Sequence, residues 1–182
     1  MIDFTADIIS YKSIANIQIG DNILSYLDEM YQYFDINCQE HELHFSMSEM
    51  TRQSFYSLND DTLTLTTTFD GDIIGIGCNQ NYQGKYQNQY KNELYAGITM
   101  EELCSLSKFQ KIVYGTLIVD NDYGLYFTLP SPYDEIADTL KDIPYDLKLN
   151  EIYVADNSSW QLKPQKKKKP KKRKIAKPYS YF

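Results

Sequence analysis

The sequence predicts an α+β fold, mainly an antiparallel sheet with a few short packing helices. Strand-forming residues are plentiful, with 17 Tyr and 8 Phe among 182 residues. Several apolar runs alternate with a period of two, whereas helical spacing of apolar residues is confined to short segments. Turn residues separate these runs in the manner of β-hairpins. With 42% hydrophobic residues, the chain is long enough to bury one sizeable core.

The first half of the chain is expected to contain one helix and several strands. A lead-in with a short strand ends at Gly20, and Asn22–Phe34 is the clearest helix because its apolar residues lie three and four apart. Asp70-Gly71 favours a type I′ turn, and Phe69 is expected to face inward just before it. The strands predicted around these features are residues 41–47, 54–58, 62–69 and 73–76.

The strongest strand signal lies in residues 111–130. We expect two long strands here around the acidic turn Asp120–Asp122, forming a hairpin in the middle of the sheet with an anionic tip. A capping box at Thr99–Glu102 predicts a short helix before it. The elements predicted after the hairpin are a short helix at residues 133–141 with Ile136 facing inward, a last strand at residues 147–155, and Trp160 at an edge of the core.

Two segments of the chain match each other when Gly20 is placed on Gly97, and each is followed by a helix and then by strands. This pattern predicts two duplicated helix-plus-sheet halves within one acidic domain of residues 1–162. The halves would span residues 1–78 and 93–162, joined by an Asn/Gln/Tyr-rich loop.

Net charge divides the chain into two unlike parts. Residues 163–182, the basic tail, contain ten Lys or Arg, three Pro and no acid, so we expect this segment to be disordered. The remaining residues carry eight basic and 25 acidic side chains, a net charge of −17. Such a body attracts cationic surfaces, although a requirement for solubility alone also explains the charge.

Three interpretations of the basic tail stay open. It would bind nucleic acid or another anionic surface without sequence specificity, direct localisation, or have no role in the fold. Its charge also suits a tail that folds back on the acidic body and screens it. The tail residues expected to contact nucleic acid or an anionic surface are Lys166, Lys167, Lys168, Lys169, Lys171, Lys172, Arg173 and Lys174.

Known catalytic and cofactor-binding motifs are absent, so the sequence predicts no enzyme activity, no catalytic residue and no cofactor. His41 and His44, three apart in a strand, would point to opposite faces, which argues against a metal site. Cys38, Cys78 and Cys104 are expected to be reduced, buried thiols. Because no apolar run spans a bilayer and no signal sequence is evident, we expect a cytoplasmic protein without membrane insertion.

Residues 95–103, 122–127 and 149–154 have the sequences YAGITMEEL, DYGLYF and LNEIYV. These three short segments resemble the small acidic immunity proteins of bacterial toxin–immunity systems, including those of contact-dependent growth inhibition. The resemblance implies a cytoplasmic protein that neutralises a cognate toxin by occluding its active site or substrate groove. The basic tail departs from this pattern.

We therefore expect an immunity-type inhibitor that binds a basic protein toxin, with a nuclease as the expected toxin, by charge complementarity. The alternatives are a nucleic-acid-associated adaptor that acts through the basic tail, or a scaffold without separable activity. In the first interpretation, acidic residues make electrostatic contacts and tyrosines act as anchors. The predicted partner contacts are Asp60, Asp61, Asp70, Asp72, Tyr82, Tyr86, Tyr90, Asp120, Asp122, Tyr133, Asp134, Glu135 and Asp138.

Overall fold

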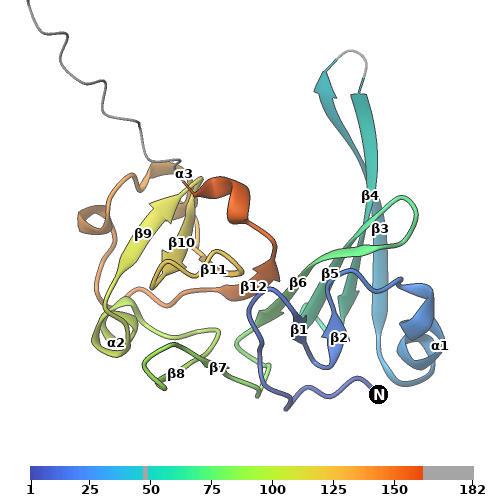
Figure 1. Cartoon of the computed structure of the whole chain (residues 1–182), viewed down its shortest axis with the longest axis horizontal. Coiled ribbons are helices and arrows are strands. Elements are labelled where there is room, and N and C mark those ends of the chain that lie inside the picture. The colour runs from blue at the N-terminus through green and yellow to red at the C-terminus, as the bar shows by residue number, and fades with distance from the viewer. Residues whose placement is uncertain (47–48, 162–182) are drawn as a thin grey trace, which may run out of the picture.

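The computed structural model describes residues 1–46 and 49–161, which form an α+β fold around one eight-stranded antiparallel sheet (Figure 1). The predicted fold class is confirmed. The helices of the described residues are α1 (Leu24–Tyr33), α2 (Met100–Leu106) and α3 (Tyr133–Ile136), with 3₁₀ helices η1 (Leu140–Asp142) and η2 (Ser158–Trp160). The strands are β1 (Ser13–Ile14), β2 (Ile17–Gln18), β3 (Ile36–Ser46), β4 (Glu49–Leu58), β5 (Leu63–Thr68), β6 (Ile73–Asn79), β7 (Tyr86–Gln87), β8 (Glu93–Leu94), β9 (Gln110–Val113), β10 (Thr116–Val119), β11 (Leu125–Thr128) and β12 (Glu151–Ala155).

The order of strands in the large sheet is β3-β4-β5-β6-β12-β11-β10-β9. Strands β3 to β6 form one meander, and β9 to β11 form another. The last strand, β12, lies between them, so that Ile152 pairs with Cys78 on one side and with Phe127 on the other. Two segments that are far apart in sequence are thereby held in one sheet. Two small hairpins, β1-β2 and β7-β8, lie outside it.

One face of the large sheet carries the core. Alternate residues of β5, β11 and β12 point to it, including the fully buried Leu65, Phe127 and Ile152. Met30 of α1 and Leu103 of α2 belong to the same buried cluster, so both helices pack on this face. Burial of each large apolar side chain contributes about 1.5–3 kcal/mol, which makes this face the main source of stability.

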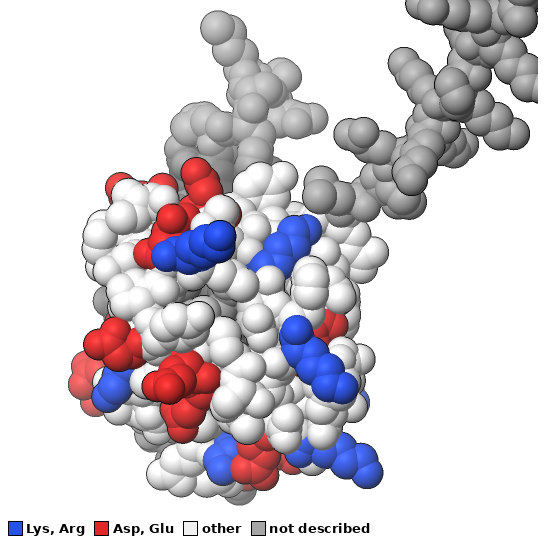
Figure 2. Space-filling view, turned by 90° about the vertical axis from the view of Figure 1, so that its left-hand side faces the viewer, with Lys and Arg blue, Asp and Glu red and all other residues white. Residues whose placement is uncertain are grey.

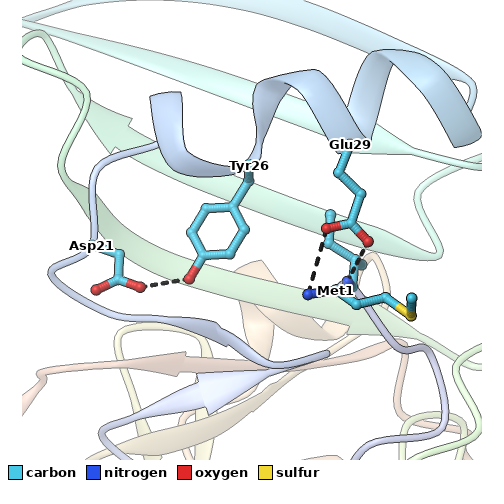
Figure 3. A network of polar contacts seen from close by, with 5 residues as sticks. Met1, Asp21, Tyr26 and Glu29 are labelled. Atoms are coloured by element: carbon cyan, nitrogen blue, oxygen red, sulfur yellow. Dashed lines mark hydrogen bonds and ion pairs between the residues drawn. The ribbon is translucent and has the colours of Figure 1, made fainter.

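Polar contacts tie the start of the chain to α1 (Figure 3). The Glu29 carboxylate accepts a hydrogen bond from the Ile2 backbone N–H at 2.6 Å, and it lies 3.6 Å from the N-terminal ammonium. One turn earlier, the Tyr26 hydroxyl donates to the Asp21 carboxylate at 2.5 Å. Burial, followed by this hydrogen bond, raises the pKa of Tyr26 to about 12. These contacts fix α1 against the segment that precedes it.

Gly20 and Gly97 occupy matching positions ahead of α1 and α2. Both have positive φ, 88° and 85°, and both donate a backbone hydrogen bond of 2.8 Å, to the carbonyl groups of Ile73 and Leu149 respectively. Beyond these contacts the two halves differ. Helix α1 has ten residues and α2 has seven. In the first half a tight turn joins the last two strands, β5 and β6, whereas in the second half a long segment with α3 and η1 joins β11 to β12. The structure therefore gives no evidence of duplicated halves.

The prediction for residues 111–130 is confirmed in part: β10 and β11 form a hairpin around Asp120–Asp122, but this hairpin does not lie in the middle of the sheet, and its first strand is interrupted. Residues 111–119 form two strands, β9 and β10, because Tyr114 and Gly115 adopt φ angles of 50° and 73° and reverse the chain. Positive φ at both central residues defines a type I′ turn, and it is uncommon for Tyr, so the sequence contains no clear turn signal here. Strand β9 is an edge of the sheet, and the β10-β11 hairpin lies beside it. The middle of the sheet is formed by β6 and β12.

Three smaller predictions are also corrected. Phe69 and Ile136, predicted to face inward, are 71% and 60% exposed. Phe69 lies beyond the last paired residue of β5, and α3 is a single turn after which Ala137 is buried instead. At Asp70-Gly71 only Gly71 has positive φ, 87°, so the turn is not type I′.

Alanine at Gly97 should destabilise the fold more than alanine at Gly20. Both substitutions place a side chain at positive φ, which costs about 1–2 kcal/mol. At Gly97 the new Cβ would also lie 2.9 Å from the Gln80 Cβ, whereas at Gly20 nothing lies within 4 Å. Overpacking adds about 1–3 kcal/mol. Urea unfolding of the two variants measures the difference, and equal losses would contradict the close packing at Gly97.

Candidate functional site on the open face of the sheet

The side of the large sheet opposite the core is lined by half-buried side chains, and we call it the open face. On β5, Thr64 and Thr66 point to this side because they alternate with buried residues. Residues that pair directly across neighbouring strands lie on the same side of the sheet. Thr64 pairs with Gly77, and Gly77 pairs with Tyr153, so all three lie on the open face. The residues of the open face are Asn37, Gln39, Phe55, Ser57, Thr64, Thr66, Gly75, Gly77, Thr116, Tyr126, Thr128, Glu151, Tyr153 and Ala155.

Three adjoining hollows form a groove along the open face. The first, of about 400 Å³, lies between Phe55 on β4 and Thr116 on β10. The second, of about 240 Å³, lies over β3 to β5, and the third, also about 240 Å³, lies at the β4-β5 turn. The first two share Phe55, Thr66 and Tyr153, and the last two share Asn37, Ser57 and Asp61.

Aromatic rings line one end of the groove. The Tyr126 and Tyr153 rings stack with centroids 5.4 Å apart and planes 7° apart. Trp160 lies 5.7 Å from Tyr126 and 5.6 Å from Tyr114. Trp160 is therefore packed on these rings and is not part of the main core cluster, contrary to the expectation that it lies at the core edge. Burial raises the pKa of Tyr126 and of Tyr153, so both are neutral hydrogen-bonding groups.

The two glycines of β6 make room for this aromatic row. A Cβ at Gly77 would lie 2.5 Å from both the Tyr153 ring and the Thr64 hydroxyl oxygen, so Tyr153 lies directly across the bare backbone. A Cβ at Gly75 would meet Thr66 at an ordinary distance of 3.6 Å. An aromatic ring that covers a glycine on the neighbouring strand stabilises a sheet where side chains are missing. Gly77 thus determines where Tyr153 lies.

The opposite end of the groove is acidic. Asp35, Asp60 and Asp61 line the third hollow, and Asn59, Asp60 and Asp61 all have positive φ, between 48° and 59°. Asn59 holds this turn: its backbone N–H donates to the Asp35 carbonyl at 2.9 Å, and its side-chain oxygen accepts from the Asp35 N–H at 3.0 Å. The Asp60 carbonyl accepts a hydrogen bond from the Asn79 amide at 3.2 Å. The turn thereby places three carboxylates around one opening, and the Ser57 hydroxyl donates a hydrogen bond to the Asp61 carboxylate.

Glu151 adds a fourth carboxylate to the open face. It is half-buried, and one oxygen lies 3.4 Å from the Thr128 hydroxyl. Burial raises the pKa of Glu151, and the negative charge of Asp61 raises it further. Ionised Glu151 is therefore disfavoured by its surroundings unless a positive charge lies nearby. Among the described residues that line the three hollows there is no Lys or Arg.

Only two of the predicted acidic contacts, Asp60 and Asp61, lie at the groove. Asp70 and Asp72 flank the β5-β6 turn, where the Asn22 side-chain amide contacts both residues. The remaining exposed acids, Asp134, Glu135 and Asp138, lie on and after α3 with the half-buried Tyr133. The end of the molecule that carries β9 and α2 shows basic and acidic side chains interspersed, with no single acidic face (Figure 2).

Three other predicted contacts, Tyr82, Tyr86 and Asp122, make hydrogen bonds within the chain. The Tyr82 side chain is buried, with its hydroxyl donating to the Ala6 carbonyl at 2.6 Å and accepting from the Ala15 N–H at 2.9 Å. The Tyr86 hydroxyl donates to Asp122 at 2.6 Å. These bonds join the 79–92 segment to the N-terminal lead-in and to the β10-β11 turn.

Asp120 has a similar internal role. Its carboxylate accepts hydrogen bonds from the backbone N–H groups of Lys108 and Phe109 at 2.9 and 3.0 Å. Tyr90 is the most exposed of the three loop tyrosines, at 37%, and the Lys108 ammonium lies 4.0 Å from its ring centroid. The acidic turn after β10 therefore organises local backbone and is not an exposed anionic tip.

The sequence interpretation missed most of the residues that line the groove, among them Asp35, Phe55, Tyr126 and Tyr153. It also missed Glu151 on the open face and the contact of Trp160 with Tyr126. Period-two alternation indicates which side of each strand faces the core, so the sequence can also identify the residues on the opposite side. The Gly-x-Gly pattern at Gly75 and Gly77 was the strongest signal, since it marks a side where another group must cover the backbone. The tail residues Lys166–Lys169 and Lys171–Lys174 lie outside the described part of the chain.

Besides the groove, the cysteine thiols and the possible metal ligands are candidate functional groups among the described residues. Cys38 is exposed, which corrects the prediction that all three thiols are buried; Cys78 is buried, Cys104 is half-buried, and all three are free. Burial raises the pKa of the Cys78 thiol to about 12, so it is a poor nucleophile. Within residues 1–46 and 49–161 there is no His, Cys, Asp and Glu group arranged to hold a metal ion, and no helix with the length and apolar character to cross a membrane.

No family model matches the sequence, and comparisons with curated proteins and with solved structures found no match. The resemblance of three short segments to immunity proteins stays a prediction.

Alanine at Gly77 should lower the free energy of unfolding by about 1–3 kcal/mol, because the new Cβ overlaps the Tyr153 ring and the Thr64 hydroxyl. Alanine at Gly75 is the matched control on the same strand and face, and it should change stability by less than about 0.5 kcal/mol. Urea unfolding measures both effects. Equal stabilities of the two variants would show that Tyr153 does not pack on Gly77 in solution.

Proposed function

We propose that this chain is an immunity-type inhibitor that binds a basic protein through the groove. The expected partner is a toxin such as a nuclease, and binding occludes its active site or substrate groove. The observation that carries the proposal is the groove itself: a concave, tyrosine-lined surface with three carboxylates at one end and no described cationic lining residue. Tyrosine side chains bury a large contact area at low conformational cost, so this lining suits a protein partner.

The distribution of charge favours a cationic partner for the acidic end. Residues 1–78 contain 13 acidic and two basic side chains, whereas the other six basic residues of the 1–162 body lie in residues 79–162. The half of the chain that holds Asp35, Asp60 and Asp61 therefore carries the larger net negative charge. Such asymmetry accelerates association with a basic protein and orients it toward that end of the groove.

Glu151 supports the same proposal. Its surroundings disfavour the ionised form, yet the chain keeps a carboxyl group at this position on the open face. A Lys or Arg side chain placed between Glu151 and Asp61 would favour ionisation of both carboxylates. A group that lowers stability in the free protein and improves a charged contact is typical of a binding surface.

The double substitution Asp60→Asn/Asp61→Asn should weaken binding of the basic partner by about tenfold or more and slow its association. Asparagine tolerates the positive φ of both positions, and its amide oxygen at position 61 can still accept the hydrogen bond from the Ser57 hydroxyl, so the main change is the loss of two charges. The matched control is Asp134→Asn/Glu135→Gln on α3, which removes two exposed charges away from the groove. Surface plasmon resonance with the partner isolated from the source cells, at two salt concentrations, measures both variants.

Inhibition of the partner's activity by the wild-type chain is the second measurement. The groove variant should inhibit at correspondingly higher concentration, and the α3 variant should inhibit as the wild type does. Equal weakening by both variants would mean that net charge and not the groove determines binding. Absence of any basic partner, together with salt-dependent binding of nucleic acid by the chain, would favour the adaptor function of the basic tail.

Glutamine at Glu151 should stabilise the fold at neutral pH and have little effect in acid. The pKa of Glu151 is raised above its ordinary 4.5, so ionisation costs folding free energy once the pH exceeds that value. Below about pH 4 the carboxyl group is protonated in both folded and unfolded chains, and the cost disappears.

Thermal unfolding of wild type and Glu151→Gln between about pH 3.5 and 7.5 measures this effect. Glu135→Gln, at an exposed position on α3, is the control and should show no gain that grows with pH. A gain from Glu151→Gln that is the same at every pH would contradict the expected cost of charge.

A further inference from the structure

We propose that the basic tail, residues 163–182, occupies the groove of its own chain in the free protein and is displaced when a basic partner binds. The proposal rests on the proposed function, because it describes the regulation of the same groove. The tail would then screen the acidic end until a partner with higher affinity competes for it.

The tail begins beside the groove. Trp160 packs on Tyr126, which stacks on Tyr153 in the aromatic end of the groove. Gln161 is the last residue that the structure describes. The tail therefore starts within a few residues of the first hollow, without a connecting segment that would have to cross the molecule.

The length of the tail fits the distance to the acidic end. From β11 to β4 there are four strand intervals, through β12, β6 and β5. At about 4.8 Å per interval, the path across the face is roughly 19 Å. An extended chain advances about 3.1 Å per residue, so Lys166–Lys169, five to eight residues after Gln161, would lie about 16–25 Å along the path. The first block of lysines thus reaches the carboxylates of Asp60 and Asp61.

The chemistry of the tail also matches the open face and not a strand edge. Ten Lys or Arg without any acid complement a groove whose described lining contains carboxylates and no Lys or Arg. Pro164, Pro170 and Pro178 lack backbone N–H donors and interrupt strand pairing, which disfavours addition of the tail to β3 or β9. An extended basic segment that lies across the face of the sheet places its positive charges near the carboxylates and needs no strand pairing at its prolines.

Carbodiimide cross-linking of the full chain tests where the tail lies. The reagent joins a lysine to a carboxylate in direct contact, and mass spectrometry identifies the joined peptides. We expect cross-links from Lys166–Lys169 to Asp60 or Asp61 in the monomer at low protein concentration, and their loss at high salt. Cross-links to Asp134 or Glu135 in equal yield, or cross-links found only in a dimer, would overturn the proposal; the latter would place the tail on a second copy.

Competition tests whether the tail blocks the groove. The probe is a fluorescent deca-lysine peptide, and the variant replaces Lys166, Lys167, Lys168 and Lys169 by Gln in the full chain. The variant should bind the probe about tenfold more tightly, because an intramolecular competitor at millimolar effective concentration has been removed. Asp60→Asn/Asp61→Asn should remove this gain. Equal binding by wild type and the lysine variant overturns the tail proposal.

The two proposals fail in different ways. If deca-lysine binds the groove and the lysine variant shows no gain, the groove is a cationic site and only the inference about the tail is lost. If the tail cross-links to Asp60 or Asp61, but neither the wild type nor the lysine variant binds a basic partner protein, the inference about the tail stands and the proposed inhibitor function is wrong.

Discussion

The pairing of β12 with both β6 and β11 is the constraint on which the rest of the structure depends. Five residue pairs join β12 to β6 and three join it to β11, and no other strand of the described chain connects the two meanders. The β12-β6 and β12-β11 pairs each close a long loop, which costs conformational entropy. Burial of the apolar side chains of Ile152 and Val154 offsets this cost. The same strand places Glu151 and Tyr153 on the open face. One element therefore holds the sheet together and supplies the centre of the groove.

Much of the local structure could be predicted from the sequence. The capping box at Thr99 forms as expected, with Glu102 contacting the Thr99 backbone and the Thr99 hydroxyl accepting from Glu102 N–H. The period-two pattern of residues 62–69 places Leu63, Leu65 and Thr67 on one side, which is the buried side in the structure, although it fails at Phe69. These features depend on neighbours a few residues apart. The order of strands depends on contacts across the whole chain, and no local pattern indicates that the last strand inserts between β6 and β11.

The site was harder to predict for a related reason. Asp60 and Asp122 both occur in turns with similar composition, yet Asp60 is exposed at the groove and Asp122 accepts hydrogen bonds from Tyr86 and Gly124. The difference lies in which donors the fold brings near each carboxylate. Tyr82 illustrates the same point, since its hydroxyl satisfies backbone groups from the N-terminal lead-in. Composition predicts an acidic, tyrosine-rich protein, and three-dimensional register decides which of those residues are used internally.

The position of β12 also has a consequence for synthesis on the ribosome. Until residues 151–155 have emerged, β6 has a partner only in β5, and its other edge presents unpaired backbone N–H and C=O groups. Such an edge is a template for pairing with other nascent chains. Gly75 and Gly77 contribute no side chain to one side of that edge, which reduces the apolar surface that a foreign strand would meet during this interval. Gly77, which later accommodates Tyr153, thus also limits the side-chain contacts that this edge offers while the chain is still incomplete.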